Sequence, residues 1–151
     1  MYDVPETPLR ITGKDKKKFL EKIFTRNIDK IKIGRAVYAF ACNHDGGILM
    51  DGVLMHPNED EFIYVQANGD FINWASANIG NLNAKIEDFN SWVLQIQGPT
   101  SLNVLSKITD INLEEFTYYS CSKVKILNKD FYISRSGSVS YTHLRAHETD
   151  Y

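Results

Sequence analysis

The order of hydrophobic and polar residues predicts a strand, a helix and a hairpin in the first third of the chain. Leu9–Thr12 alternates apolar and polar residues, as a half-buried strand does. Lys14–Phe24 places its apolar residues on one helical face with lysines opposite, which predicts an amphipathic helix. After the polar connector Thr25–Gly34, a predicted strand at Arg35–Ala41 leads into a turn at Asn43–Gly47.

The middle of the chain continues this hairpin into a predicted three-stranded meander. Ile48–Met55 returns from the turn, and Glu61–Gln66 follows a second turn at Pro57–Asp60. Asn68–Ile79 then has the periodicity of a second helix, with apolar and aromatic residues turned inward.

Shorter elements complete the predicted fold. They are the strands Lys85–Glu87 and Trp92–Gln97, a helix that starts at Thr100 and is packed by Leu102, Val104, Leu105 and Ile108, and a hairpin of Val124–Leu127 and Phe131–Arg135 around Asn128–Asp130. Strands and helices mix without regular βαβ alternation. The predicted class is therefore α+β, with a largely antiparallel sheet and packed helices.

The stretch Cys42–Met55, CNHDGGILMDGVLM, contains two competing hairpin signals. Asp45-Gly46 and Asp51-Gly52 both have the sequence of a tight turn, but only Gly47–Met50 would remain between them as a strand. We assign the turn to the first pair and leave Asp51 within, or at a kink of, the following strand. Gly52 would then let a ligand approach the backbone.

Asp51 is the first candidate for function, because a lone carboxylate in an apolar strand is costly to bury unless something is bound to it. Tyr38 could be part of the core or could present its ring to a flat ligand. His44 and His56 are interpreted as turn or surface histidines, and Cys42 as a small buried hydrophobe. Together these residues favour a small-molecule pocket.

Composition narrows the class of protein. A chain of 151 residues with 43% hydrophobic and 12% aromatic content predicts one globular domain with a real core. A formal charge of −2 argues against binding nucleic acid by bulk electrostatics, and the lysine-rich segments 14–18 and 30–32 are interpreted as solvated surface. Two cysteines predict neither a disulfide framework nor a metal site. Without a signal peptide or long apolar run, we expect no membrane contact and a cytoplasmic location.

The end of the chain differs from the rest. Val139–Thr149, VSYTHLRAHET, resembles one translated frame of an adapter used in preparing sequencing libraries. We therefore interpret residues 138–151 as a scar that is not native, and residues 1–137 as the N-terminal part of a longer protein.

Four segments resemble successive blocks of the folate-dependent aminomethyltransferase superfamily, whose best-known member is the T-protein of the glycine cleavage system. They are MYDVPETPLRITGKD, NIDKIKIGRAVYAFACNHDGGILMDGVLM, WVLQIQGPTSLNVL and ISRSG. Met50 stands where the T-protein usually has the first of two acids. CNHDG with MDGVL, Asn73-Trp74 and IQGP resembles the demethylase branch more closely, which includes dimethylsulfoniopropionate demethylase and tetrahydrofolate-dependent aromatic O-demethylases.

This resemblance implies a fold, a reaction and a site. Members have three domains around a central pocket, and this chain would supply much of the first. They pass a one-carbon unit from a small-molecule donor to tetrahydrofolate. Asp51 falls on the second acid of the family pair, where a catalytic carboxylate lies beside the pterin. The positions implied to line the folate pocket are Tyr38, Val53, Met55 and either Gln66 or Asn68.

The implied function is a tetrahydrofolate-dependent methyl- or aminomethyltransferase, with a lipoyl carrier protein as partner only if the chain belongs to a true glycine-cleavage enzyme. An alternative is a non-catalytic folate-binding protein of the same fold that assists iron–sulfur cluster assembly. Asp51 within a complete GGxxxD block favours the enzyme. A third hypothesis is that residues 1–137 alone neither fold stably nor bind a ligand.

Overall fold

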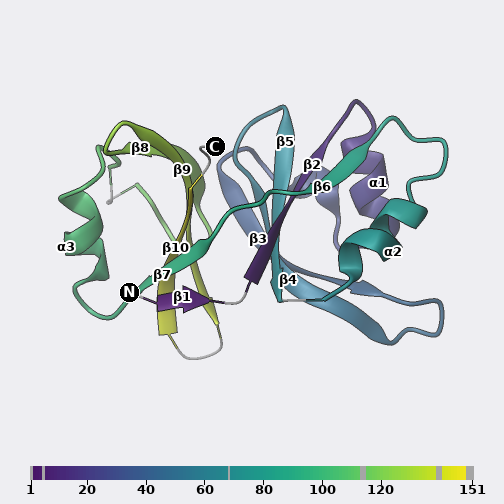
Figure 1. Ribbon diagram of the computed structural model, residues 1–151, viewed down its shortest axis with the longest axis horizontal. Helices are drawn as coiled ribbons and strands as arrows, with labels where there is room; N and C mark the ends of the chain where they lie inside the picture. Colours follow the sequence, from purple (N-terminus) through teal and green to yellow (C-terminus); the bar gives the residue numbers. More distant parts are fainter. Residues whose placement is uncertain (1, 5, 68, 113–114, 139–140, 149–151) are drawn as a thin grey trace.

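The structure, a computed structural model, contains two five-stranded antiparallel sheets that lie side by side (Figure 1). It describes the backbone of residues 2–148 apart from residues 5, 68, 113–114 and 139–140, and side chains within residues 6–136. The α+β class with antiparallel strands is confirmed, although the sequence did not predict a division into two sheets. No helix in the described residues is long and apolar enough to cross a membrane.

The first sheet carries the predicted three-stranded meander, with strands in the order β3-β4-β5-β2-β6. Its strands are β2 (Glu6–Thr12), β3 (Arg35–Cys42), β4 (Ile48–His56), β5 (Glu61–Ala67) and β6 (Lys85–Asp88). Three helical segments accompany it: α1 (Lys16–Ile23), the 3₁₀ helix η1 (Ile28–Lys30) and α2 (Phe71–Ala77). Each predicted element in this half of the chain is therefore present, with ends shifted by a few residues.

The helices and one face of the first sheet form a hydrophobic core. The apolar face of α1 buries Phe19, Leu20 and Ile23, as the helical periodicity predicts. Tyr64 of β5 lies at the centre of this core, where its ring is 4.6 Å from that of Phe24. Its hydroxyl donates a hydrogen bond of 3.2 Å to the Ala39 carbonyl, so the buried phenol is satisfied, and burial raises its pKa.

The second sheet has the order β1-β7-β10-β9-β8 (Figure 1). Its strands are β1 (Tyr2–Val4), β7 (Val93–Gln97), β8 (Cys121–Ile126), β9 (Lys129–Ser138) and β10 (Tyr141–Glu148), and the helix α3 (Ser101–Ser106) follows β7. The sequence missed β1 and β10. Since β10 lies within the segment 138–151, the interpretation of that segment as a scar remains a prediction.

Two details of the second sheet differ from the sequence-based expectation. The β8–β9 hairpin is confirmed, but it turns at Leu127 and Asn128, whose φ angles are +50° and +66°, rather than at 128–130. Leu105 packs α3 as predicted, whereas Val104 is 46% and Ile108 43% exposed. The helix is only six residues long, so it buries a single narrow stripe.

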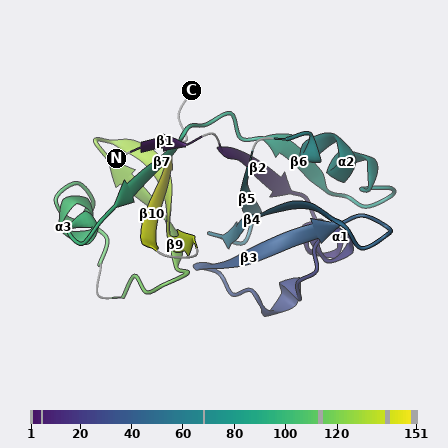
Figure 2. The same cartoon turned by 90° about the horizontal axis from the view of Figure 1, so that it is seen from below.

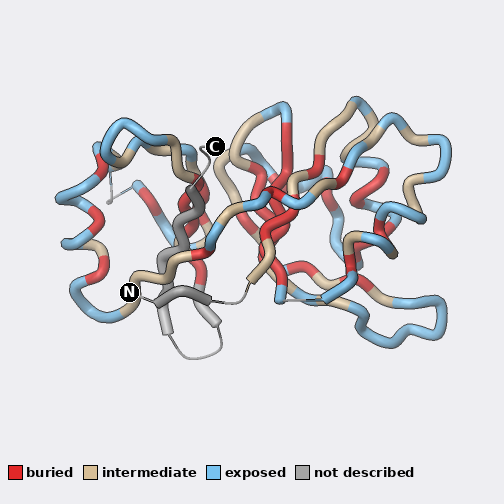
Figure 3. Tube along the Cα trace, viewed as in Figure 1, coloured by how far each residue is buried: buried red, intermediate tan, exposed pale blue. Residues whose placement is uncertain are grey.

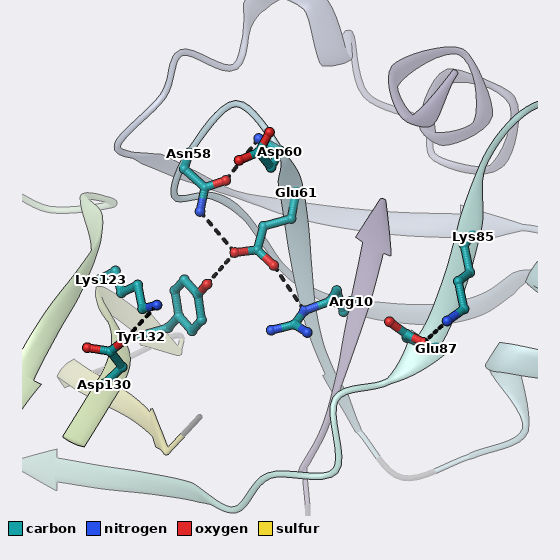
Figure 4. Close-up of polar contacts among 9 residues, drawn as sticks. All are labelled: Arg10, Asn58, Asp60, Glu61, Lys85, Glu87, Lys123, Asp130 and Tyr132. Carbon is teal, nitrogen blue, oxygen red and sulfur yellow. Dashed lines mark hydrogen bonds and ion pairs between the residues drawn. The ribbon is translucent and has the colours of Figure 1, made fainter. Parts of the chain in front are cut away.

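A buried carboxylate joins the two sheets (Figure 4). Glu61 of β5, 8% exposed, accepts hydrogen bonds from the Tyr132 hydroxyl of β9 and from the Asn58 amide at 2.9 Å. Its other oxygen lies 2.9 Å from the Arg10 Nε, and the Arg10 guanidinium stacks 4.4 Å from the Phe89 ring centroid. Apolar side chains from both sheets, among them Val53, Ile63 and Tyr132, form a second buried cluster, so part of the second face of the first sheet is also buried.

Candidate functional site

The candidate site lies on the β3–β4 hairpin, whose turn the sequence predicted correctly. The Asn43 N–H donates to the Gly47 carbonyl at 2.8 Å, and the Asn43 side-chain oxygen accepts from the backbone N–H groups of Asp45 and Gly47. Gly46 has a φ of +84°, a conformation that glycine adopts without steric cost. Asp45-Gly46 is therefore the turn, and Asp51 lies within β4.

Asp51 is exposed, so the expectation of a buried acid is wrong. The neighbouring strand β5 pairs with β4 only over Gly52–Met55, and the part of β4 before Gly52 pairs with β3 alone. The hairpin consequently projects past the sheet, and its end is exposed (Figure 3). Ile48 and Leu49 are 67% and 39% exposed. A bulge at Leu49 shifts the register between Ala41 and Cys42.

Gly52 serves the sheet rather than a ligand. A Cβ atom there would lie 2.2 Å from the Val65 carbonyl oxygen and 3.1 Å from the Tyr64 ring. The missing side chain therefore lets β5 approach β4, and the expectation that Gly52 opens the backbone to a ligand is not supported by this geometry.

Tyr38 and Asp51 form the polar centre of the site. They lie diagonally across the hairpin, and the Tyr38 hydroxyl donates a hydrogen bond of 2.7 Å to Asp51 Oδ2. Tyr38 is 46% exposed, so it is a surface residue and not part of the core. The hydrogen bond to Asp51, followed by desolvation and the negative charge of Asp51, raises the pKa of Tyr38. The phenol thus stays protonated and orients one carboxylate oxygen.

The remaining predicted pocket residues divide between the two faces of the sheet. Val53 lies opposite Tyr38 and points to the same face, where Val53 and the fully buried Met55 join the apolar contact between the sheets. Gln66 shares its face with Tyr64, on the helix side, because side chains alternate along β5. Asn68 lies outside the described residues. The structure therefore brings Asp51, Tyr38 and Val53 together and separates Gln66 from them.

Gln66 is unusual in itself. It is 1% exposed, and neither its side-chain oxygen nor its nitrogen has a hydrogen-bond partner among the described residues. Buried amides in proteins are normally satisfied. Its cross-strand neighbours are Thr7 on β2 and Gly52 on β4, and Gly52 has no side chain to meet it.

Two aromatic residues at the site were not predicted. Phe40 lies directly opposite Asp51, with its ring 6.3 Å from that of Tyr38. Tyr119 lies in the segment before β8, where its backbone carbonyl accepts a hydrogen bond from the Ala36 N–H at 2.8 Å. Its side chain also contributes to the raised pKa of Tyr38. The only sequence signal for Tyr119 is the tyrosine pair 118–119, which falls outside any periodic segment.

Other candidates have structural explanations. His44 is exposed in the turn as predicted, but His56 is buried, so its interpretation as a surface histidine is wrong. The His56 ring stacks on Phe62 at 4.0 Å and its Nδ1 lies 2.9 Å from the Ile31 carbonyl, which fixes the proton on Nδ1. Burial lowers the pKa of His56. Cys42 is half-buried, and the described residues contain no cluster of potential metal ligands.

Sequence and structure comparisons identify related proteins. The model of the GCVT N-terminal domain family matches residues 3–147. An aminomethyltransferase from Clostridium botulinum (strain ATCC 19397 / Type A) is 32% identical over 133 residues, which are 84% of this chain and 36% of that protein. An aminomethyltransferase from Thermoanaerobacter sp. (strain X514) is 32% identical over 146 residues, covering 91% of this chain and 39% of that protein. The chain thus spans little more than a third of these relatives.

Solved structures share the fold. The glycine cleavage system aminomethyltransferase T from Bartonella henselae superposes with a TM-score of 0.85 at 20% identity, covering 96% of this chain and 40% of that chain. The heterotetrameric sarcosine oxidase from Corynebacterium sp. U-96 in complex with pyrrole 2-carboxylate gives a TM-score of 0.69 at 16% identity, covering 97% of this chain and 74% of that chain.

Proposed function

Because the chain belongs to the GCVT N-terminal domain family, we propose that the protein transfers a one-carbon unit from a small-molecule donor to tetrahydrofolate. The observation that supports this activity most directly is the Asp51–Tyr38 pair. Its carboxylate is accessible on the surface, and the Tyr38 phenol holds it at 2.7 Å. The aminomethyltransferases from C. botulinum and Thermoanaerobacter are the relatives on which the reaction class rests.

Asp51 supplies the charge that this reaction needs. Attack by a pterin nitrogen on the carbon of the donor leaves positive charge on that nitrogen, and a nearby carboxylate stabilises the charge or accepts the displaced proton. Tyr38 donates its hydrogen bond to Oδ2 of Asp51, so in this proposal Oδ1 is the oxygen that interacts with the ligand. The Phe40 ring, 6.3 Å from that of Tyr38, lies beside this group and offers a flat surface to a pterin.

The donor in this proposal is a methyl compound. Met50 stands beside Asp51 where a glycine-cleavage enzyme would be expected to have the first acid of the pair. A site with one carboxylate suits a donor that gives up a methyl group from sulfur or oxygen. An aminomethyl donor on a lipoyl carrier protein would instead make this a glycine-cleavage enzyme.

The experiment measures formation of methyl- or methylenetetrahydrofolate by the complete protein with methylsulfonium, methoxyaryl and aminomethyl donors. Asp51→Asn should lower the rate with the preferred donor about 100-fold or more. Asp45→Asn is the matched control, because Asp45 is also an exposed acid on this hairpin; it should change the rate by about twofold at most.

A full rate in Asp51→Asn would remove Asp51 from the mechanism. If the protein binds tetrahydrofolate but transfers carbon from none of the three donors, the non-catalytic folate-binding alternative replaces the enzyme.

A further inference from the structure

A recess lies on the outer edge of β3, away from the Asp51 carboxylate. Its volume is about 450 Å³, and it is lined by Thr25, Arg26, Asn27, Lys30, Ile31 and Val37. The segment that contains the first five of these residues follows α1 and runs along β3 (Figure 2). This volume lies within the range of small-molecule sites in proteins.

Positive charge dominates the recess. Arg26 and Lys30 are exposed and form no ion pair within the part of the chain that the structure describes, and no acid lines the recess. The nearby acid Glu21 is already engaged, because its Oε1 accepts hydrogen bonds from the backbone N–H groups of Ile28 at 2.7 Å and Asp29 at 3.4 Å. Two lining cations with no acid among the lining residues favour an anionic ligand.

The edge of β3 offers a polar backbone group next to Val37, which lines the recess. The Ala36 N–H donates outward to the Tyr119 carbonyl at 2.8 Å, and the Phe40 carbonyl accepts from the Thr25 N–H at 3.1 Å. Alternate residues of a strand point their N–H and C=O groups the same way, so those of Tyr38 also point outward. Among the described residues, nothing is bonded to them. Between Ala36 and Phe40, only Tyr38 has both its outward N–H and its outward C=O unpaired in the part of the chain that the structure describes, which is enough to bind one amide but not a whole added strand.

Apolar side chains complete the recess. Val37 is half-buried and lines the recess together with the buried Ile31, so part of the lining is apolar. From these features we propose that the recess binds a small carboxylate that carries an amide and an apolar group, that is, an N-acyl amino acid. The carboxylate would pair with Arg26 and Lys30, the amide with the backbone of Tyr38, and the apolar group with Val37.

The test uses N-benzoylglycine as the probe, with binding measured by calorimetry and by amide chemical shifts. We expect a dissociation constant of about 1 mM or below, and shifts concentrated in residues 25–31 and 36–39. The double variant Arg26→Gln/Lys30→Gln should weaken binding by about tenfold or more.

Lys17→Gln/Lys18→Gln is the matched control, since it removes the same charge from exposed positions on α1 outside the recess. It should change the affinity by about twofold at most. Equal weakening in both double variants would show general charge attraction and overturn the proposal. Binding of inorganic phosphate as tight as that of N-benzoylglycine would overturn the ligand class, because phosphate lacks the amide and the apolar group.

Discussion

Asp51 and Glu61 lie on neighbouring strands of one sheet, and their surroundings are opposite. Glu61 is 8% exposed and contacts three side chains, from Arg10, Asn58 and Tyr132. Asp51 is exposed and, among the described residues, accepts a single side-chain hydrogen bond, from Tyr38. A carboxylate with every partner supplied by the protein has no capacity left for a ligand, whereas Asp51 keeps one oxygen available. The difference separates a structural acid from a functional candidate.

Asp51 has the opposite exposure to that expected from the sequence, whereas Glu61 is the buried acid. The cost of burying a charge predicted that a lone acid in an apolar strand would be buried against a ligand. In the structure, the acid that bears that cost is Glu61, and the network around it offsets the loss of hydration. Burial therefore identifies a carboxylate that the fold needs, and accessibility identifies one that chemistry can use.

The largest effect on stability is expected at Glu61. Glu61→Ala leaves Tyr132 and Arg10 without their shared acceptor at the contact between the sheets, and should lower the free energy of unfolding by about 3 kcal/mol. Denaturant unfolding measures this loss. The control is Glu87→Ala. It removes an ion pair with Lys85 on the surface, so it should lower the free energy of unfolding by less than about 1 kcal/mol. Equal losses at both positions would contradict the structural role of Glu61.

A smaller loss is expected at Gly52, next to Asp51. Gly52→Ala places a Cβ against the Val65 carbonyl oxygen and forces β4 and β5 apart, which should lower the free energy of unfolding by about 2 kcal/mol. Gly47→Ala is the control, because a Cβ there meets only the Asn43 side chain, at 3.3 Å. An unchanged denaturation midpoint in Gly52→Ala would show that the close approach of the strands is not needed.

His56 should make stability depend on pH. Burial lowers the pKa of His56 in the folded state, so the unfolded chain binds the proton more tightly. This contribution is fully present above the unfolded pKa of about 6.5 and is lost as the pH falls through the lower folded pKa. The melting temperature should therefore fall between about pH 7 and about pH 5, and less so in His56→Gln. The same pH dependence in both proteins would rule out His56 as the cause.

The smallest effect on stability is expected at Tyr38. Tyr38→Phe removes one exposed hydrogen bond and should change the free energy of unfolding by less than about 0.5 kcal/mol. The transfer rate should nevertheless fall about tenfold, because Asp51 loses the group that orients it. A stability loss as large as that of Glu61→Ala would make the Tyr38–Asp51 pair structural.

The sequence predicted the local elements well because their signals are local. Apolar periodicity located α1, and the Asn43–Gly47 turn followed from residues that favour positive φ angles and side-chain capping. The exposure of Asp51 could not be predicted, because it depends on where β5 stops pairing with β4. The same holds for Tyr119 and Glu61, whose partners are far away in the chain.

The most direct test of the contrast between the two acids is the stabilisation of the protein by tetrahydrofolate. Denaturation midpoints are measured with and without the folate for the wild type, Asp51→Asn and Glu61→Gln. We predict that Asp51→Asn has the same midpoint as the wild type without folate, and that folate raises its midpoint much less. Glu61→Gln should have a lower midpoint without folate, and folate should raise it as much as it raises that of the wild type. The contrast between the two acids would be contradicted if Asp51→Asn had a lower midpoint than the wild type without folate and folate raised its midpoint as much as that of the wild type.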